Sequence, residues 1–175
     1  DRTMIGRGLP IHTGGFTNNF EYKGFDLSVF FQWSYGNDVL NANRLFFDSG
    51  FQKKRELNQY ASYTDRWTPE NPNSNIPAAT NSSSNLVISS RVVEDASFLR
   101  LKTVTLGYTV PKTFLKKYKI DNARLYVAAQ NLWTITGYSG YDPEVSIRSG
   151  GLTPGLDFSS YPRALSVSFG INLGF

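Results

Sequence analysis

Two carboxylates in the segment Tyr141-Asp142-Pro143-Glu144 are the residues of this chain best placed to do chemistry. Asp142 and Glu144 stand two positions apart beside an aromatic ring, which is the composition of a glycosidase acid pair or of a cation site. Hydrolysis needs such carboxylates held about 5 to 9.5 Å apart across a sugar by a rigid cleft. A turn around Pro143 explains the same residues by ordinary turn chemistry. We favour the turn, and we expect neither an enzyme nor a metal site.

Aromatic rings offer a second kind of chemistry, because their faces stack on sugar rings. For Trp67 we leave open a ligand contact and a structural role at a membrane interface. For Tyr161, Trp33, Tyr35 and Trp133 we favour the structural role. The residues we name as candidates for contact with a ligand, or with a protein that covers the loops, are Trp67, Tyr138, Tyr141 and Asp142.

Composition excludes several classes of site. The 175 residues include no Cys and a single His, His12, so a thiolate site, a disulfide and a site of two imidazoles are all excluded. No phosphate loop or nucleophile elbow is present, and we expect no cofactor. The net charge of +4 comes from scattered basic residues. One cluster comprises Lys112, Lys116, Lys117 and Lys119, which we interpret as a solvated turn, and we expect no nucleic-acid partner.

The clearest structural signal is a strict alternation near the end of the chain. From Leu165 to Phe175, bulky apolar residues alternate with Ser, Asn and Gly. Period-two alternation places the apolar side chains on one face of a strand. The run matches the ~9 to 11 residues that a tilted strand needs to cross a bilayer, and it stops on an aromatic residue. We therefore interpret this strand as facing lipid.

Similar alternation appears in four more segments, two of them joined at Lys23-Gly24 as a hairpin. The predicted strands cover about 14–22, 25–35, 98–110, 123–135 and 162–175. A mean hydropathy of −0.32 and an aromatic share of 15% suit membrane strands, which hide apolar residues in alternation. The side chains predicted to face lipid are Leu27, Val29, Phe31, Val104, Leu106, Leu125, Val127, Val167, Phe169 and Ile171.

The connections between these strands alternate between short and long. The long ones, about 36–96 and 137–160, are rich in Pro, Asn, Ser and Gly. Membrane barrels pair long extracellular loops with short periplasmic turns, so we expect the carboxy-terminus and the turns at Lys23 and Lys116 on the periplasmic side. The predicted fold class is all-β: an antiparallel up-and-down transmembrane β-barrel, of which this chain supplies about five strands at the carboxy-terminal end. A barrel needs at least ~8 strands, and neither a signal peptide nor a run of ~18 apolar residues is visible. We expect a piece of a longer exported protein.

Several segments resemble the carboxy-terminal part of the SusC/RagA family of TonB-linked outer-membrane receptors of Bacteroidota. They occur in the family's order over nearly the whole chain, and they read FDLSVFFQWSYGND, RWTPENPNSNIP, EDASFLRLKTVTLGYTVP, ARLYVAAQNLWTITGYSGYDPEV and GLDFSSYPRALSVSFGINLGF. The resemblance implies a plugged barrel of about 22 strands in the outer membrane, the size class whose lumen is filled. It also implies that the last residues act as an outer-membrane assembly signal, at Ser168, Gly170, Leu173 and Phe175.

The same resemblance implies transport. Members import an oligosaccharide, or in some relatives a peptide, with energy from the TonB complex, and they pair with a SusD-like surface lipoprotein that forms a lid. Nothing in this chain resembles the plug or the TonB box, so contact with TonB is expected through other parts of the protein. Two alternatives remain at this point. One is a soluble β-sandwich that binds carbohydrate through Trp67 and Tyr141, and the other is a hydrolase that depends on Asp142.

Overall fold

The computed structural model describes residues 3–50, 58–81, 85–147 and 154–175. The chain divides into two compact units. We call the first the sheet unit; it comprises His12–Tyr35, Phe98–Thr136 and Arg163–Phe175. We call the second the loop unit; it comprises Asp1–Ile11, Gly36–Ser97 and Gly137–Pro162. Within the described residues, no helix has the length and apolar character needed to cross a membrane.

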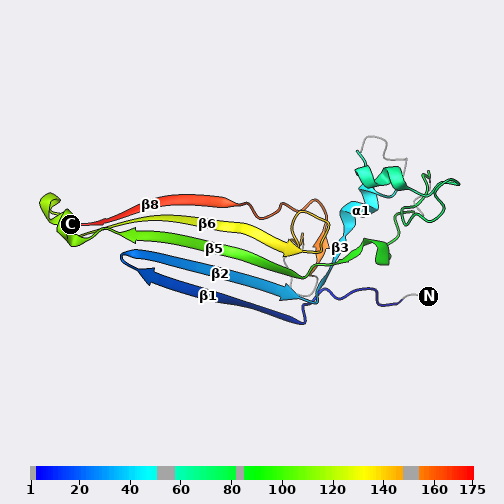
Figure 1. Ribbon diagram of the computed structural model, residues 1–175. Helices are drawn as coiled ribbons and strands as arrows, with labels where there is room; N and C mark the ends of the chain where they lie inside the picture. Colours follow the sequence, from blue (N-terminus) through cyan, green and yellow to red (C-terminus); the bar gives the residue numbers. More distant parts are fainter. Residues whose placement is uncertain (1–2, 51–57, 82–84, 148–153) are drawn as a thin grey trace. The chain divides into compact units, whose positions relative to one another are not determined.

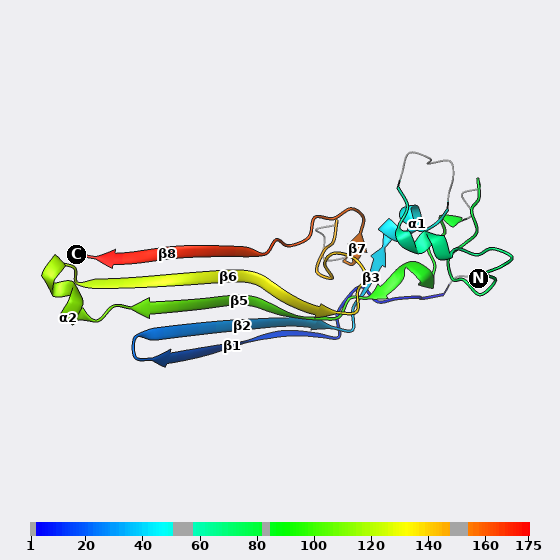
Figure 2. The same ribbon diagram turned by 45° about the horizontal axis from the view of Figure 1, so that its top comes forward.

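The sheet unit is a single five-stranded sheet in the order β1-β2-β5-β6-β8, with every neighbouring pair antiparallel (Figures 1 and 2). The predicted all-β, up-and-down antiparallel class is therefore confirmed, as an open sheet whose edges are β1 and β8. Its strands are β1 (His12–Tyr22), β2 (Phe25–Tyr35), β5 (Phe98–Thr109), β6 (Asn122–Thr136) and β8 (Ser166–Gly174).

The last strand begins later than the predicted 162, at Ser166. Pro162 has no backbone N–H to give to a ladder, and the chain before the strand is held by a side chain instead, since the Asn131 amide donates to the Ala164 carbonyl at 2.9 Å. Asn131 has a φ of 53° and lies where the β5–β6 register shifts, between Leu101 and Thr103. Because of this shift, Leu101 joins the face of Val104 although their spacing is odd.

Two short connections lie at the end of the sheet where the chain terminates (Figure 1). Lys23 and Gly24 join β1 to β2 with φ values of 48° and 87°, which is the pair of positive angles that a type I′ hairpin turn requires. The second connection contains α2 (Lys112–Leu115) and a 3-10 helix, η5 (Lys116–Tyr118), and joins β5 to β6. The amide of Asp121 then donates to the Gly174 carbonyl at 2.8 Å, which ties this connection to β8.

The loop unit contains a small sheet that the sequence analysis did not predict. Its order is β4-β3-β7, with β3 and β4 antiparallel and β3 and β7 parallel. The ranges 36–96 and 137–160 were predicted as long loops only, because strands this short show no readable alternation. Residues 51–57, 82–84 and 148–153 of those ranges lie outside the described residues. The elements are β3 (Asp38–Asn41), α1 (Ala42–Phe47), η2 (Ala61–Asp65), η4 (Ser90–Val92), β4 (Val93–Asp95) and β7 (Leu156–Asp157).

A small core supports this sheet. One buried cluster joins Val39, Ala96 and Tyr138, and a second joins α1 to Val92. The Tyr138 hydroxyl donates to Asp157 Oδ2 at 2.6 Å, and both side chains are buried. Burial, together with this hydrogen bond to a carboxylate, raises the pKa of the Tyr138 hydroxyl above its ordinary value. Tyr138 therefore stays a neutral donor and fastens β7 to the chain after β6.

Glu94 on β4 is the polar centre of the loop unit. Its carboxylate accepts hydrogen bonds from the Ser139 backbone at 2.9 Å, from the Ser139 hydroxyl at 2.9 Å and from the Asn41 amide at 3.0 Å. Arg44 Nη1 lies 3.4 Å from the same carboxylate. Burial by itself would raise the pKa of Glu94, but these donors and Arg44 favour the charged form and lower the pKa on balance. One carboxylate thus joins three separate stretches of the loop unit.

Because the folded-state pKa of Glu94 is lowered, the stability it contributes is fully present above the ordinary carboxyl pKa of about 4.3 and is lost as the pH falls through the lowered value. We expect the protection of loop-unit amides against hydrogen exchange, corrected for the intrinsic rate, to fall between about pH 5 and about pH 3 in the full-length protein. Glu94→Gln should lose about 1 to 3 kcal/mol of loop-unit stability at neutral pH and show a weaker acid transition. Identical acid profiles for the two proteins would contradict this role.

Candidate functional site

The register of the sheet brings all ten residues that were predicted to face lipid onto one face. Leu27 pairs with Leu106, which pairs with Val127, which pairs with Phe169. The neighbouring row runs through Val29, Val104, Ala129 and Val167. The remaining predicted members occupy adjacent rows of the same face, namely Phe31, Leu125 and Ile171. We call this surface the apolar face.

The apolar face is uncovered. Phe169 is 78% exposed, Ile171 is 64% exposed and Leu106 is 48% exposed. A β-sandwich would need a second sheet packed on these side chains, and the described residues of the sheet unit form one sheet only. Contiguous apolar surface of this kind marks contact with a membrane or with another protein.

Aromatic side chains gather at both ends of the apolar face. At one end Phe25 packs on Tyr108, with ring centroids 4.6 Å apart. At the other end Trp33 Nε1 donates to His12 Nδ1 at 3.1 Å, and the His12 ring stacks on Tyr35 at 5.1 Å. His12, the single histidine of the chain, therefore belongs to an aromatic cluster. Such clusters at both limits of an apolar band are typical of membrane strands.

The strand length fits a membrane as well. The 11 residues of β2, at about 3.3 Å each and tilted by about 40°, would cover about 25 to 28 Å along the membrane normal. This is close to the ~25 Å height of the apolar band of outer-membrane barrels.

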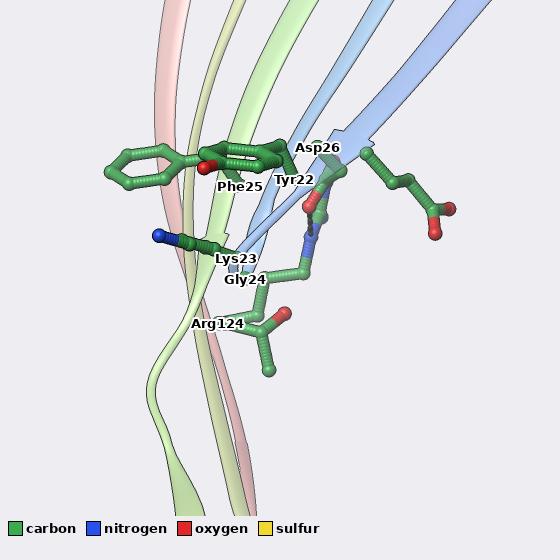
Figure 3. A pocket seen from close by; sticks show the side chains of 8 residues that line it. Tyr22, Lys23, Gly24, Phe25, Asp26 and Arg124 are labelled. Atoms are coloured by element: carbon green, nitrogen blue, oxygen red, sulfur yellow. Dashed lines mark hydrogen bonds and ion pairs between the residues drawn. The ribbon is translucent and has the colours of Figure 1, made fainter.

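The opposite face is polar and carries an ion pair between two strands that are not neighbours in the sheet, β2 and β6. Arg124 on β6 donates from Nε to Asp26 Oδ1 at 2.9 Å and from Nη2 to the second carboxylate oxygen, although β5 lies between the two strands (Figure 3). The residue of β5 between them is Gly107, and a Cβ there would overlap both side chains. Glycine at this position therefore makes the pairing of β2 with β6 side chains sterically feasible.

Gly170 on β8 is covered in a comparable way. It pairs with Tyr126 on β6, and the Tyr126 ring lies where a Cβ on Gly170 would be. The proposed assembly-signal residues divide between the two faces: Ser168 and Gly170 lie on the polar face, Leu173 lies on the apolar face, and Phe175 follows the strand and is exposed. Gly170 thus has a packing role that the sequence analysis missed, because a glycine in a strand pattern does not reveal which ring covers it.

The loop residues singled out for ligand contact separate into two groups. Tyr141 is 87% exposed and Trp67 is 43% exposed, so both rings are available to a partner. Tyr138 is 6% exposed and Asp142 is 3% exposed; this corrects their assignment, because buried side chains present no surface to a ligand. Asp142 Oδ1 accepts a hydrogen bond from the Glu144 backbone at 2.9 Å, which is the turn chemistry favoured from the sequence. Among the described residues, no cluster of potential metal ligands occurs.

The loop unit also contains a polar hollow that had no signal in the sequence. It measures about 630 Å³ and is bordered by Arg44, Asp48 and Arg91, among others. Arg44 is engaged by Asp48 at 3.5 Å and by Glu94 at 3.4 Å. Arg91 Nη1 is buried and finds no hydrogen-bond partner in the described part of the chain. The hollow can accommodate water or a small polar group beside Arg91.

Comparison with known proteins gives consistent relatives. No family model matches the sequence. The chain is 38% identical over 180 residues to TonB-dependent receptor P3 of Formosa agariphila, covering 100% of this chain and 17% of the relative. It is 29% identical over 162 residues to TonB-dependent receptor SusC of Bacteroides thetaiotaomicron, covering 92% of this chain and 15% of the relative. The chain thus spans less than a fifth of the length of these receptors.

Solved structures agree with the sequence relatives. A chain from the RagAB peptide transporter superposes with a TM-score of 0.78 at 31% identity, covering 93% of this chain and 17% of that one. A chain from the RagAB peptide importer in the closed-closed state superposes with a TM-score of 0.82 at 30% identity, covering 98% and 18%. The relatives are receptors and transporters rather than enzymes. With its alternating strands, its five-stranded antiparallel sheet and these relatives, the chain belongs to the SusC/RagA family of TonB-dependent receptors.

Proposed function

We propose that this chain forms part of the wall of an outer-membrane, TonB-dependent importer. The observation that carries the proposal is the apolar face, which is exposed, has the height of a membrane and is bordered by aromatic clusters at both ends. The polar face would then line the lumen of the barrel. Further strands of the same protein would pair with the free edges of β1 and β8, since barrels close to remove such edges.

The orientation follows from the connections. The Lys23-Gly24 turn and the α2–η5 connection are short, whereas β2 leads to β5 and β6 leads to β8 through the loop unit. Long connections lie outside the cell in outer-membrane barrels. The loop unit would therefore face the exterior, and the end of the sheet near Phe175 would face the periplasm.

For substrate and partners, we propose an oligosaccharide or a peptide, delivered with the help of a SusD-like lipoprotein. The likeness to SusC and to the RagAB peptide importer supports this class of cargo and a two-protein assembly. Exposed Trp67 and Tyr141 are the side chains of the loop unit that we assign to contact with the substrate or the lipoprotein. Contact with the TonB complex is assigned to parts of the protein outside this chain.

The membrane assignment can be tested by placing the same charge on either face of β8. Val167 lies on the apolar face of the edge strand β8, in the row of Val29, which is near the middle of the length of β2. Ser166 is its neighbour on the polar face. Val167→Arg should cost about 2 to 4 kcal/mol near the bilayer midplane, and Ser166→Arg should cost much less. The readout is the amount of heat-modifiable, folded full-length protein in the outer membrane. Equal loss for the two variants would contradict the assignment.

A substitution at Gly170 tests whether this residue acts by packing under Tyr126 or only as part of the assembly signal. Gly170→Ala should lower the amount of folded protein, because the new Cβ displaces the Tyr126 ring. If packing is the cause, Tyr126→Ala should restore much of the loss, and the two changes should be strongly non-additive. A role in assembly recognition alone predicts no rescue. The amount of assembled full-length protein, with Ser168→Ala as the matched change on the same face, distinguishes the two.

The proposed loop contacts can be tested by measuring substrate uptake. In a strain that lacks the native gene, full-length receptor with Trp67→Ala and Tyr141→Ala should take up its glycan or peptide with about tenfold lower apparent affinity, equivalent to about 1.4 kcal/mol. Tyr161→Ala removes an equally exposed ring to which we assign a structural role, and serves as the control. Unchanged uptake by the double variant, at normal surface levels, would remove these residues from the substrate path.

A further inference from the structure

Five lysines gather at the end of the sheet where the chain terminates, and the proposed importer function leaves them unexplained. They are Lys23 in the hairpin turn and Lys112, Lys116, Lys117 and Lys119 in the connection between β5 and β6. We call these five residues the basic collar. All of them are exposed, and none forms an ion pair with a described residue. The carboxylates at this end of the sheet are fewer, and one of them, Asp26, is already held by Arg124.

Exposed aromatic rings are interleaved with the basic collar. Phe114 and Tyr118 belong to the same connection and are about two-thirds exposed. Lys117 Nζ lies 6.0 Å from the centre of the Tyr118 ring, and Lys23 Nζ lies 5.2 Å from the centre of the Tyr22 ring. A soluble turn gains nothing from displaying such rings. At a membrane interface, by contrast, aromatic rings and lysines are both favoured, since the ring sits among the headgroups and the ammonium reaches toward phosphate.

The basic collar is continuous with the apolar face. Figure 3 shows the Lys23 side chain on the same side of the hairpin as the rings of Tyr22 and Phe25, and away from the Asp26–Arg124 pair. Phe25 is the first residue of β2 and belongs to the apolar face at this end, where it packs on Tyr108. On the other connection, α2 packs against β6, and Leu115 of α2 and Ala123 of β6 are both buried. The collar therefore follows the border at which the apolar surface gives way to charge.

We propose that the basic collar binds phospholipids whose headgroups carry a net negative charge, in the leaflet that surrounds this end of the sheet. The inference rests on the proposed membrane orientation and adds a ligand class to it. Lysine suits this ligand because its ammonium is a compact point charge that needs no fixed partner geometry. Juxtamembrane lysines attract anionic lipid over a distance of about one Debye length. Such binding would fix the depth of the barrel at its periplasmic side.

The test uses the full-length receptor purified from outer membranes in detergent and titrated with either phosphatidylglycerol or phosphatidylcholine. Native mass spectrometry counts the lipids that remain bound. The wild type should retain phosphatidylglycerol in preference to phosphatidylcholine. Replacing all five lysines with Gln should reduce phosphatidylglycerol retention by about tenfold or more, with phosphatidylcholine unaffected, and replacing the same five with Arg should preserve it.

Three results would overturn the inference: no preference for phosphatidylglycerol in the wild type, full retention by the Gln variant, or equal loss in the Gln and Arg variants. The last would show that the shape of the turn, rather than its charge, holds the lipid. Recovery of the wild type in the outer-membrane fraction tests the proposed function separately. A correctly inserted Gln variant with unchanged lipid retention would sink the lipid inference and leave the importer proposal intact.

Discussion

The sheet depends on one constraint: within the described residues of the sheet unit, its apolar side chains have no second layer to pack against. Alternation assigns these side chains to one face, and the register aligns them across five strands, so the surface they create must be satisfied from outside the sheet. Water is an unfavourable partner, because rows such as Leu27, Leu106, Val127 and Phe169 would be left hydrated. In the proposed membrane wall, lipid hydrocarbon would satisfy them without a further protein layer, and a single sheet would suffice.

The polar face works under a different restriction, since it must keep the strands aligned without a packed core. Here small residues and long side chains complement one another. Gly107 leaves space for the Asp26–Arg124 pair, and Gly170 leaves space for the Tyr126 ring. A ring over a strand glycine replaces the missing side-chain contact. The loop unit, in contrast, has a conventional small core and a central carboxylate, Glu94, so the two units are stabilised by different means.

The sheet unit was more predictable from the sequence than the loop unit. Long alternating segments such as 25–35 and 98–110 revealed their strands and the residues that share a face, because every second residue reports on the same environment. The Lys23-Gly24 turn was readable because glycine tolerates its positive φ. The three-stranded sheet of the loop unit was not, since its strands are too short to show a period. The burial of Tyr138 and Asp142 was equally hidden, because nothing in their local sequence distinguishes a core tyrosine from one that meets a ligand.

Contact between the apolar face and lipid hydrocarbon can be measured residue by residue. The chain contains no cysteine, so single cysteines placed in turn from Val167 to Leu173 in the full-length receptor can carry a fluorophore in lipid vesicles. Quenching by lipids that carry a nitroxide in the acyl chain should alternate, strong at 167, 169, 171 and 173 and weak at 168, 170 and 172. Uniform quenching along β8, or strong quenching at the even positions, would contradict the account.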